Sequence, residues 1–265
     1  MAYSAQLRKN FKADARERIH QRFWPTMGAV ILAMIPEGLI TLIYRSANSR
    51  QALGMATISM LIYIAAAIFI LPPITMGIWT YYVARARGQE SSPAMVFQCF
   101  GDGKSYTNSI KIMFSIFVRS LGWAALEVVV MVPWVVLVAY LAFEEGSAQG
   151  SLWIALLVLS VLLIVVSLLV NVKIRRYDGT YIRMIDNPTQ SAWAVSGECA
   201  QTFRGHNWEL LVFDLSFILW ALGTVITLGI VGIYTTAYMG VAFVNYFDAL
   251  RLHETGPKYT MEPGE

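Results

Sequence analysis

Four ionisable side chains interrupt long apolar stretches of this sequence, and they are its best candidates for chemistry. They are Glu37, Arg119, Glu127 and Asp214. In the hydrocarbon of a bilayer such a residue is costly unless it is paired or hydrated, which makes it a functional candidate by default. Two interpretations are open. The residues could line a polar path for a proton, an ion or a small solute, or they could serve packing alone, with two charges paired and the glutamates protonated or at the outer surface.

The spacing of these residues predicts which of them meet. Arg119 and Asp214 lie about 12 Å and about 9 Å along their helices from the preceding polar linkers, at similar depth. We therefore predict that they form an ion pair between the third and fifth spans. Glu127 projects from roughly the same face as Arg119. Glu37 lies about 20 Å along its helix, near the predicted depth of Glu127.

Helices that cross a membrane must position these charges. The apolar stretches occupy approximately residues 24–44, 55–84, 112–143, 151–172 and 210–250, and a helix needs roughly 20 apolar residues to cross. The last stretch would be about 60 Å long as one helix, so we predict a turn at Gly229–Gly232 and two spans, 210–228 and 233–250. Pro72 and Pro73 predict a kink in the second span. The expected fold is all-α: a polytopic membrane helix bundle of six transmembrane helices.

Composition and charge agree with this fold class and predict its orientation. Hydrophobic residues make up 57% of the chain and charged residues 14%, whereas a soluble domain has about 25% charged residues. Nearly all of the 20 Lys and Arg residues fall in the two tails and in the linkers after the second and fourth spans. Basic loops stay in the cytoplasm, so both termini are predicted there. The charged N-terminal segment is unlike a signal peptide, so the first span should remain as an anchor.

The linkers predict short cytoplasmic helices and an internal repeat. Ser92-Pro93 and Asn187-Pro188 each resemble an N-cap followed by Pro at the first helical position, and the helices that follow should lie in the membrane interface. We predict three units of one interfacial helix and one transmembrane hairpin, at approximately 1–88, 89–180 and 181–252, within a single membrane domain that ends in a tail at 253–265. The rival explanation is chance similarity among apolar sequences.

The N-terminal segment fits the same plan. An apolar stripe repeats every four residues on an otherwise basic helix: Leu7, Phe11, Ala15, Ile19 and Phe23. The basic face could bind anionic lipid, since each surface cation contributes about 1 kcal/mol. Control of topology alone explains the same charges, and both explanations stay open.

The last third of the chain resembles a known family. The residues that carry the resemblance are Gly205, Trp208, Asp214, Ser216, Trp220, Gly229 and Tyr246, within FRGHNW, DLSFILW, TLGI and NYF. They resemble the C-terminal signature of the bacterial integral membrane family known as domain of unknown function nine-seven-five. This chain has Ala237-Tyr238 where that family often has Pro-Tyr. The resemblance implies a six-span protein of the bacterial cytoplasmic membrane and brings no established reaction.

No motif in the sequence predicts catalysis. The two cysteines and three histidines have no metal-ligand spacing, and GDGKS at 101–105 lacks the first glycine of a phosphate-binding loop. We expect no enzyme activity, cofactor, metal or nucleic-acid partner. The favoured function is that of an accessory, assembly or partner-binding membrane protein. Its partner would be another membrane protein or, in a homo-oligomer, a second copy of the chain. The alternative is a small transporter or channel for a proton, an ion or a small polar or amphipathic solute.

Overall fold

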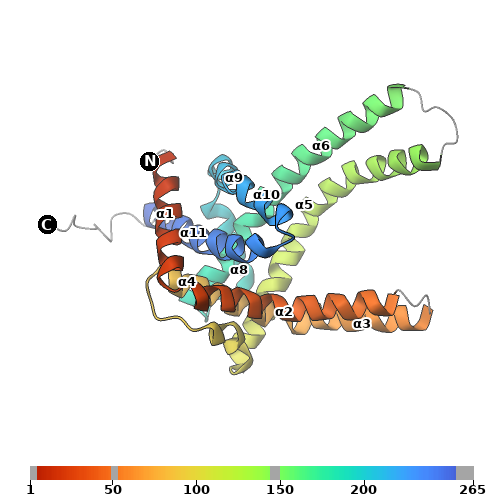
Figure 1. Ribbon diagram of the computed structural model, residues 1–265. Helices are drawn as coiled ribbons and strands as arrows, with labels where there is room; N and C mark the ends of the chain where they lie inside the picture. The colour runs from red at the N-terminus through yellow and green to blue at the C-terminus, as the bar shows by residue number, and fades with distance from the viewer. Residues whose placement is uncertain (1–4, 49–52, 144–149, 255–265) are drawn as a thin grey trace.

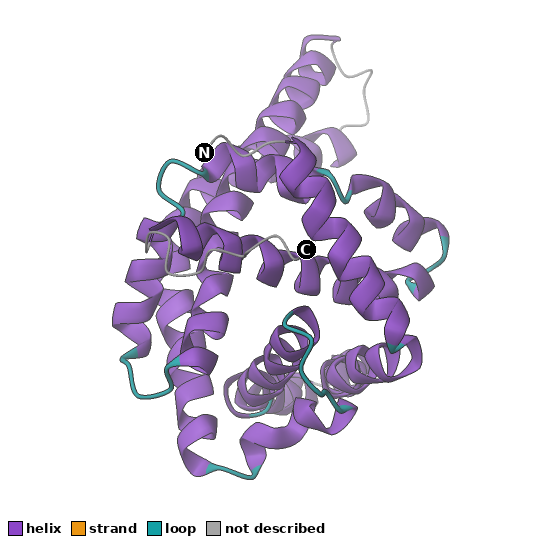
Figure 2. Cartoon of the chain, turned by 90° about the vertical axis from the view of Figure 1, so that its left-hand side faces the viewer, coloured by secondary structure: helices purple, strands orange, loops and turns teal. Residues whose placement is uncertain are grey.

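The computed structural model describes residues 5–48, 53–143 and 150–254, and these residues are almost entirely helical (Figures 1 and 2). No strand occurs in this part of the chain. The elements are α1 (Ala5–Gln21), α2 (Phe23–Asn48), α3 (Leu53–Phe69), α4 (Leu71–Ala86), the 3₁₀ helix η1 (Pro93–Phe100), α5 (Gly103–Phe143), α6 (Gly150–Arg175), the 3₁₀ helix η2 (Arg176–Asp178), α7 (Gly179–Asp186), α8 (Ala192–Thr202), α9 (Asn207–Leu215), α10 (Ile218–Ile226) and α11 (Ile230–Glu254).

Six segments are long and apolar enough to cross a membrane, which confirms the predicted fold class. They are Phe23–Arg45, Thr57–Ala86, Gly103–Phe143, Gly150–Asp186, Asn207–Ile226 and Ile230–Leu252. A turn also divides the last apolar stretch, as predicted, but it lies earlier than Gly229–Gly232, because α10 ends at Ile226 and α11 begins at Ile230.

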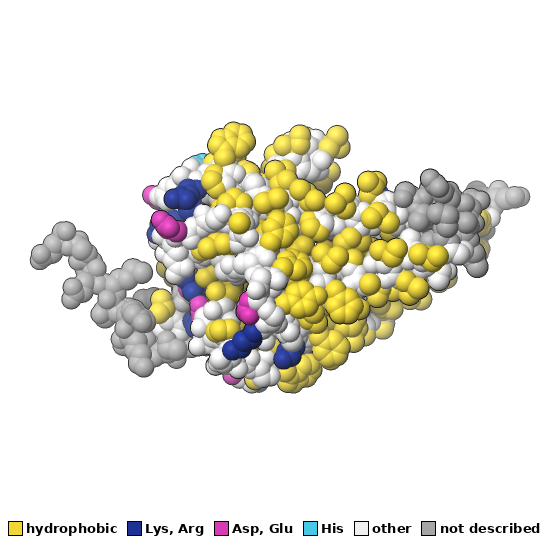
Figure 3. Space-filling view, turned by 90° about the horizontal axis from the view of Figure 1, so that it is seen from below, with side chains coloured by type: hydrophobic (Ala, Val, Ile, Leu, Met, Phe, Trp, Pro, Cys, Tyr) yellow, Lys and Arg dark blue, Asp and Glu magenta, His cyan; other side chains and the backbone are white. Residues whose placement is uncertain are grey.

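The hairpins divide the molecule into a core and two arms. The α2–α3 hairpin and the α5–α6 hairpin project from the core and diverge from each other, whereas the third hairpin lies against the core (Figure 1). Charged side chains gather at the core end of the face in Figure 3, and apolar side chains cover the arms. This separation is the one expected for a protein whose arms lie in hydrocarbon and whose core meets the polar surface.

The prolines break the second span at Ile70, two residues before Pro72. Helix α3 ends at Phe69, and α4 begins at Leu71 with Pro72 and Pro73 in its first turn. A proline has no amide N–H, so Pro73 cannot bond the carbonyl group four residues before it. That carbonyl belongs to Phe69, and it accepts a hydrogen bond from the Tyr106 hydroxyl of α5 instead, at 3.0 Å. The break therefore joins the first hairpin to the second.

The core forms where the chain returns from each hairpin, in what we call the return segments: α4, η2–α7 and α11. Trp79 of α4 stacks on Tyr181 of α7 with the ring centroids 5.8 Å apart, and it meets Phe243 of α11 edge-on at 5.7 Å. Trp79 thus contacts one aromatic ring from each of the other two return segments.

Each return segment also brings one glycine into close contact with another part of the chain. A methyl group added at any of the three would overlap its neighbour. The contacts are Gly77 on the Val96 carbonyl of η1, Gly179 on the Phe247 ring of α11, and Gly240 on the Tyr82 ring of α4. Gly179 and Gly240 let the return segments approach one another, and Gly77 lets α4 approach η1, because glycine has no side chain. The pattern fits the predicted three units, although the repeat itself stays a prediction and α7 continues past the predicted boundary at residue 180.

Two expectations about the linker helices need correction. Asn187 ends α7, and α8 begins only at Ala192 after Ser191, so Asn187-Pro188 does not start a helix. Ser92 does cap η1, accepting a hydrogen bond from the Ala94 amide. The apolar stripe of α1 packs on protein rather than lying bare on lipid, because Ala15 and Ile19 are fully buried and α1 packs along α11.

The glycine contacts make a testable prediction about stability. Gly77→Ala should destabilise the protein by about 1–3 kcal/mol, the usual cost of inserting a methyl group into a well-packed core. The measurement is thermal unfolding of the purified protein in detergent. Gly122→Ala in α5 is the matched control, since nothing lies within 4 Å of its added Cβ. Equal unfolding temperatures for the two variants would contradict the close-packing argument.

Candidate functional site

The predicted ion pair between Arg119 and Asp214 is wrong. Arg119 donates hydrogen bonds to the Ser196 hydroxyl at 2.8 Å and to the Trp193 carbonyl at 2.9 Å, both in α8. Its guanidinium also lies 4.2 Å from the centre of the Trp193 ring. Helix α5 packs on α8, whereas α9, which carries Asp214, packs on α6. The similar depth predicted for Arg119 and Asp214 did not make their helices neighbours.

Asp214 lies instead beside Arg175 at the end of α6. The Arg175 Nε and Asp214 Oδ1 atoms are 3.7 Å apart, and Arg175 makes a closer ion pair with Asp178 of η2 at 2.5 Å. The same guanidinium lies 4.8 Å from the centre of the Phe243 ring. Among the described residues, no donor makes a hydrogen bond to either oxygen of Asp214. Arg175 therefore compensates two carboxylates at once and fixes α6 against α9 and η2.

The two glutamates lie on different arms. Glu127 of α5 accepts a hydrogen bond from the Ser167 hydroxyl of α6 at 2.6 Å, so it ties together the two helices of one arm. Glu37 lies exposed on α2, in the other arm. The arms diverge (Figure 1). The four predicted charges therefore lie in separate environments, and the described part of the chain does not bring them together at one site.

The charges that do converge are four others, at the ends of the three return segments. We call them the arginine–aspartate cluster: Arg87 after α4, Asp186 of α7, and Asp248 and Arg251 of α11. Arg87 donates to Asp186 at 2.6 Å and to Asp248 at 2.9 Å. Arg251 donates to the second oxygen of Asp186 at 2.6 Å. The hydrogen bond to Asp248 is the main reason that the pKa of Arg87 is raised, despite partial burial.

Sequence reasoning missed this cluster because Arg87, Asp186 and Arg251 lie outside the apolar stretches and Asp248 lies at the very end of the last one. One signal was present: three stretches that contain or directly precede the members of the cluster, YYVARARG, RRYDGTYIRM and NYFDAL, share a pattern of small, aromatic and charged residues. The spacing within each stretch gave no indication that their ends meet.

The cluster predicts an effect of removing its central anion. Asp186→Asn should lower the free energy of unfolding by about 1–3 kcal/mol, because Arg87 and Arg251 would then face each other with one carboxylate fewer between them. Thermal unfolding in detergent at low salt is the measurement. Glu198→Gln is the control: its ion pair with Arg183 is more exposed and should contribute less than about 1 kcal/mol. An unchanged unfolding temperature for Asp186→Asn would show that the cluster does not hold the return segments together.

The two cysteines are free and buried, Cys99 in η1 and Cys199 in α8. Burial raises the pKa of the Cys99 thiol to about 11 and that of Cys199 to about 12. In the described residues, no group of three or more His, Cys, Asp or Glu side chains could hold a metal ion.

These thiols should react slowly in the folded protein. Thiolate is the reactive form, and a raised pKa leaves almost none of it at pH 7.5. We expect a maleimide to leave both cysteines unlabelled in mild detergent and to label both after denaturation in sodium dodecyl sulfate. Mass spectrometry of the intact chain counts the labels. Rapid labelling of the folded protein would contradict the burial of these residues.

The residues of the family-like signature shape the third hairpin. Gly205 and Gly229 have positive φ angles of 91° and 97° at turns before α9 and α11. Trp220 packs on Tyr234 at 5.2 Å between ring centroids. Ser216 accepts a hydrogen bond from Lys12 of α1, and Tyr246 is buried. Trp208 is 72% exposed. Apart from Trp208 and Asp214, the residues of the signature serve packing and turns.

Comparison with known proteins identifies the family. The model of a family described as a protein of unknown function (DUF975) matches residues 1–254, so the chain belongs to this family. No curated protein and no solved structure matches the chain.

Proposed function

We propose that this member of the DUF975 family is a non-enzymatic accessory protein of the bacterial cytoplasmic membrane, with both termini in the cytoplasm, and that its arms bind transmembrane helices of a partner protein. The observation that carries the proposal is the shape of the α5–α6 arm. It projects from the core as two helices alone (Figure 1). Large apolar side chains on its outer faces are exposed, including Val129, Val136 and Leu157.

The arm is a preformed surface. Its two helices are tied by the hydrogen bond between Ser167 and Glu127 and by a second one from the Trp134 indole to the Ser160 hydroxyl, at 2.9 Å. Packing between membrane helices depends on van der Waals contact and interhelical hydrogen bonds. A rigid pair of helices presents such contacts without the cost of ordering itself on binding.

The transport alternative finds less support. Carriers build their sites near the bilayer midplane from groups that converge between helices. Here Arg119 turns toward α8, Asp214 toward α6, and the two glutamates lie on separate arms. Arg119, Glu127 and Asp214 instead hold pairs of elements together, which suits a scaffold that acts through its surfaces.

Photo-cross-linking in native membranes tests the proposal. A photoreactive amino acid at Val136, on the outer face of α5, should give adducts heavier than the protein by the mass of a partner. The matched control is the same substitution at Ser160, which faces Trp134 inside the arm and should give no intermolecular adduct. Mass spectrometry identifies the adducts. Adducts with lipid alone would contradict the proposal, and adducts of twice the chain mass would show that the partner is a second copy rather than another protein.

A further inference from the structure

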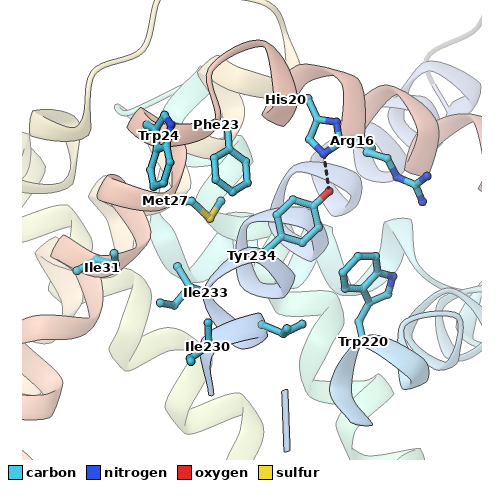
Figure 4. A pocket seen from close by; sticks show the side chains of 11 residues that line it. Arg16, His20, Phe23, Trp24, Met27, Ile31, Trp220, Ile230, Ile233 and Tyr234 are labelled. Carbon is cyan, nitrogen blue, oxygen red and sulfur yellow. Dashed lines mark hydrogen bonds between the residues drawn. The ribbon is translucent and has the colours of Figure 1, made fainter. Parts of the chain in front are cut away.

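An apolar groove separates the junction of α1 and α2 from α10 and α11 (Figure 4). Its volume is about 730 Å³, within the range of small-molecule sites. Aromatic and aliphatic side chains form most of the lining: Phe23, Trp24, Met27, Ile31, Trp220 and Ile233. Trp24 is 80% exposed, so the groove is open on one side rather than enclosed.

The polar groups of the groove lie at one end. Arg16 and His20 of α1 line that end, beside Tyr234 of α11 (Figure 4). The Tyr234 hydroxyl and His20 Nε2 are 3.4 Å apart. Within the described residues, Arg16 forms no ion pair with an acidic side chain, and its guanidinium lies 5.8 Å from the centre of the Tyr238 ring. The groove therefore has an apolar lining and, at one end, a cation that no acidic side chain of the described residues neutralises.

The surroundings of Arg16 favour an anion. Helix α1 carries more basic than acidic side chains. The pKa of Lys12, one turn before Arg16, is lowered first by burial and then by the positive charges of Arg8 and Arg16. Lys12 itself is engaged, since its ammonium group donates to the carbonyl and hydroxyl oxygens of Ser216. Arg16 is therefore the cation of this region that faces the groove.

The opposite end of the groove is suited to hydrocarbon. Ile230 and Val231 line it, directly after an apolar turn in which Leu228 is 95% exposed. The amide groups of this turn, from Thr227 to Val231, are hydrogen-bonded within the hairpin, the last of them to the Thr227 hydroxyl. A turn can lie in lipid only when its backbone is satisfied in this way. The groove therefore runs from a cationic surface helix to a segment compatible with the bilayer interior.

We propose that this groove binds one anionic phospholipid, with its phosphate on Arg16 and His20 and an acyl chain along Met27, Ile31 and Ile233. Arginine matches the geometry of phosphate through paired N–H donors, and the tryptophans lie where an interfacial aromatic belt would be expected. The groove borders the base of the α2–α3 arm, and it does not involve the α5–α6 arm or a partner bound there.

Binding of tail-labelled phospholipids to the purified full-length protein in nonionic detergent tests the proposal. Phosphatidylglycerol should bind at least about tenfold more tightly than phosphatidylcholine, and Arg16→Gln should weaken phosphatidylglycerol binding by at least about tenfold. Lys9→Gln is the charge-matched control: Lys9 is exposed on the same helix and does not line the groove. Measuring at about 0.5 M salt screens the general attraction of the basic helix, so Lys9→Gln should then have no more than about a twofold effect.

A second pair of variants tests the apolar part of the site. Val231→Trp places an indole in the groove and should abolish phosphatidylglycerol binding. Ile226→Trp introduces the same side chain at a position that is 81% exposed and does not line the groove, so it should bind as the unmodified protein does. Thermal unfolding shows that each variant is folded before binding is compared.

Three results would overturn the proposal. Equal binding of phosphatidylcholine and phosphatidylglycerol would show that the headgroup charge is not recognised. Equal losses for Arg16→Gln and Lys9→Gln would show that lipid binds the helix surface generally rather than this groove. If Val231→Trp changes the oligomeric mass and leaves lipid binding intact, the groove is a protein interface.

Discussion

The structure depends on the close approach of the three return segments. Glycines at the contacts let α4, α7 and α11 approach until Trp79 of α4 contacts an aromatic ring from each of the other two, and the arginine–aspartate cluster joins their ends. The glycine contacts act along the faces of the return segments, and the arginine–aspartate cluster acts at their ends. Together they fix where each hairpin leaves the core, and so they set the divergence of the arms.

Most buried side chains lie in the core. Polar side chains inside an arm therefore find their partners within their own hairpin. Inside the α5–α6 arm, hydrogen bonds from Ser167 to Glu127 and from Trp134 to Ser160 join the two helices of the hairpin. Contacts between hairpins occur near the core, where Tyr106 of α5 bonds the freed carbonyl of Phe69. Because lipid supplies no hydrogen-bonding groups, an arm that stands alone must satisfy its polar side chains internally. The outer faces are left apolar and available for lipid or protein.

Much of the fold could be predicted because it depends on local composition. Long apolar runs identified the six spans, and the excessive length of the last run required the turn that is found at Thr227–Gly229. The pairing of charges could not be predicted in this way. Depth along a helix places a residue on one axis only, and Arg119 and Asp214, predicted at similar depth, contact different neighbours. Asn187-Pro188 failed for a related reason: α7 already uses Asn187 as its end.

Most residues of the family-like signature form turns or pack within the fold. Gly205 and Gly229 form turns, Trp220 and Tyr246 pack in the third hairpin, and Ser216 holds α1 through Lys12. Such residues define a scaffold, and a scaffold can serve many functions. The features that differ from a closed bundle are the exposed arms and the groove with a cation at its end. Both surfaces suit hydrophobic or amphiphilic molecules, and the proposals of partner binding and lipid binding rest on them.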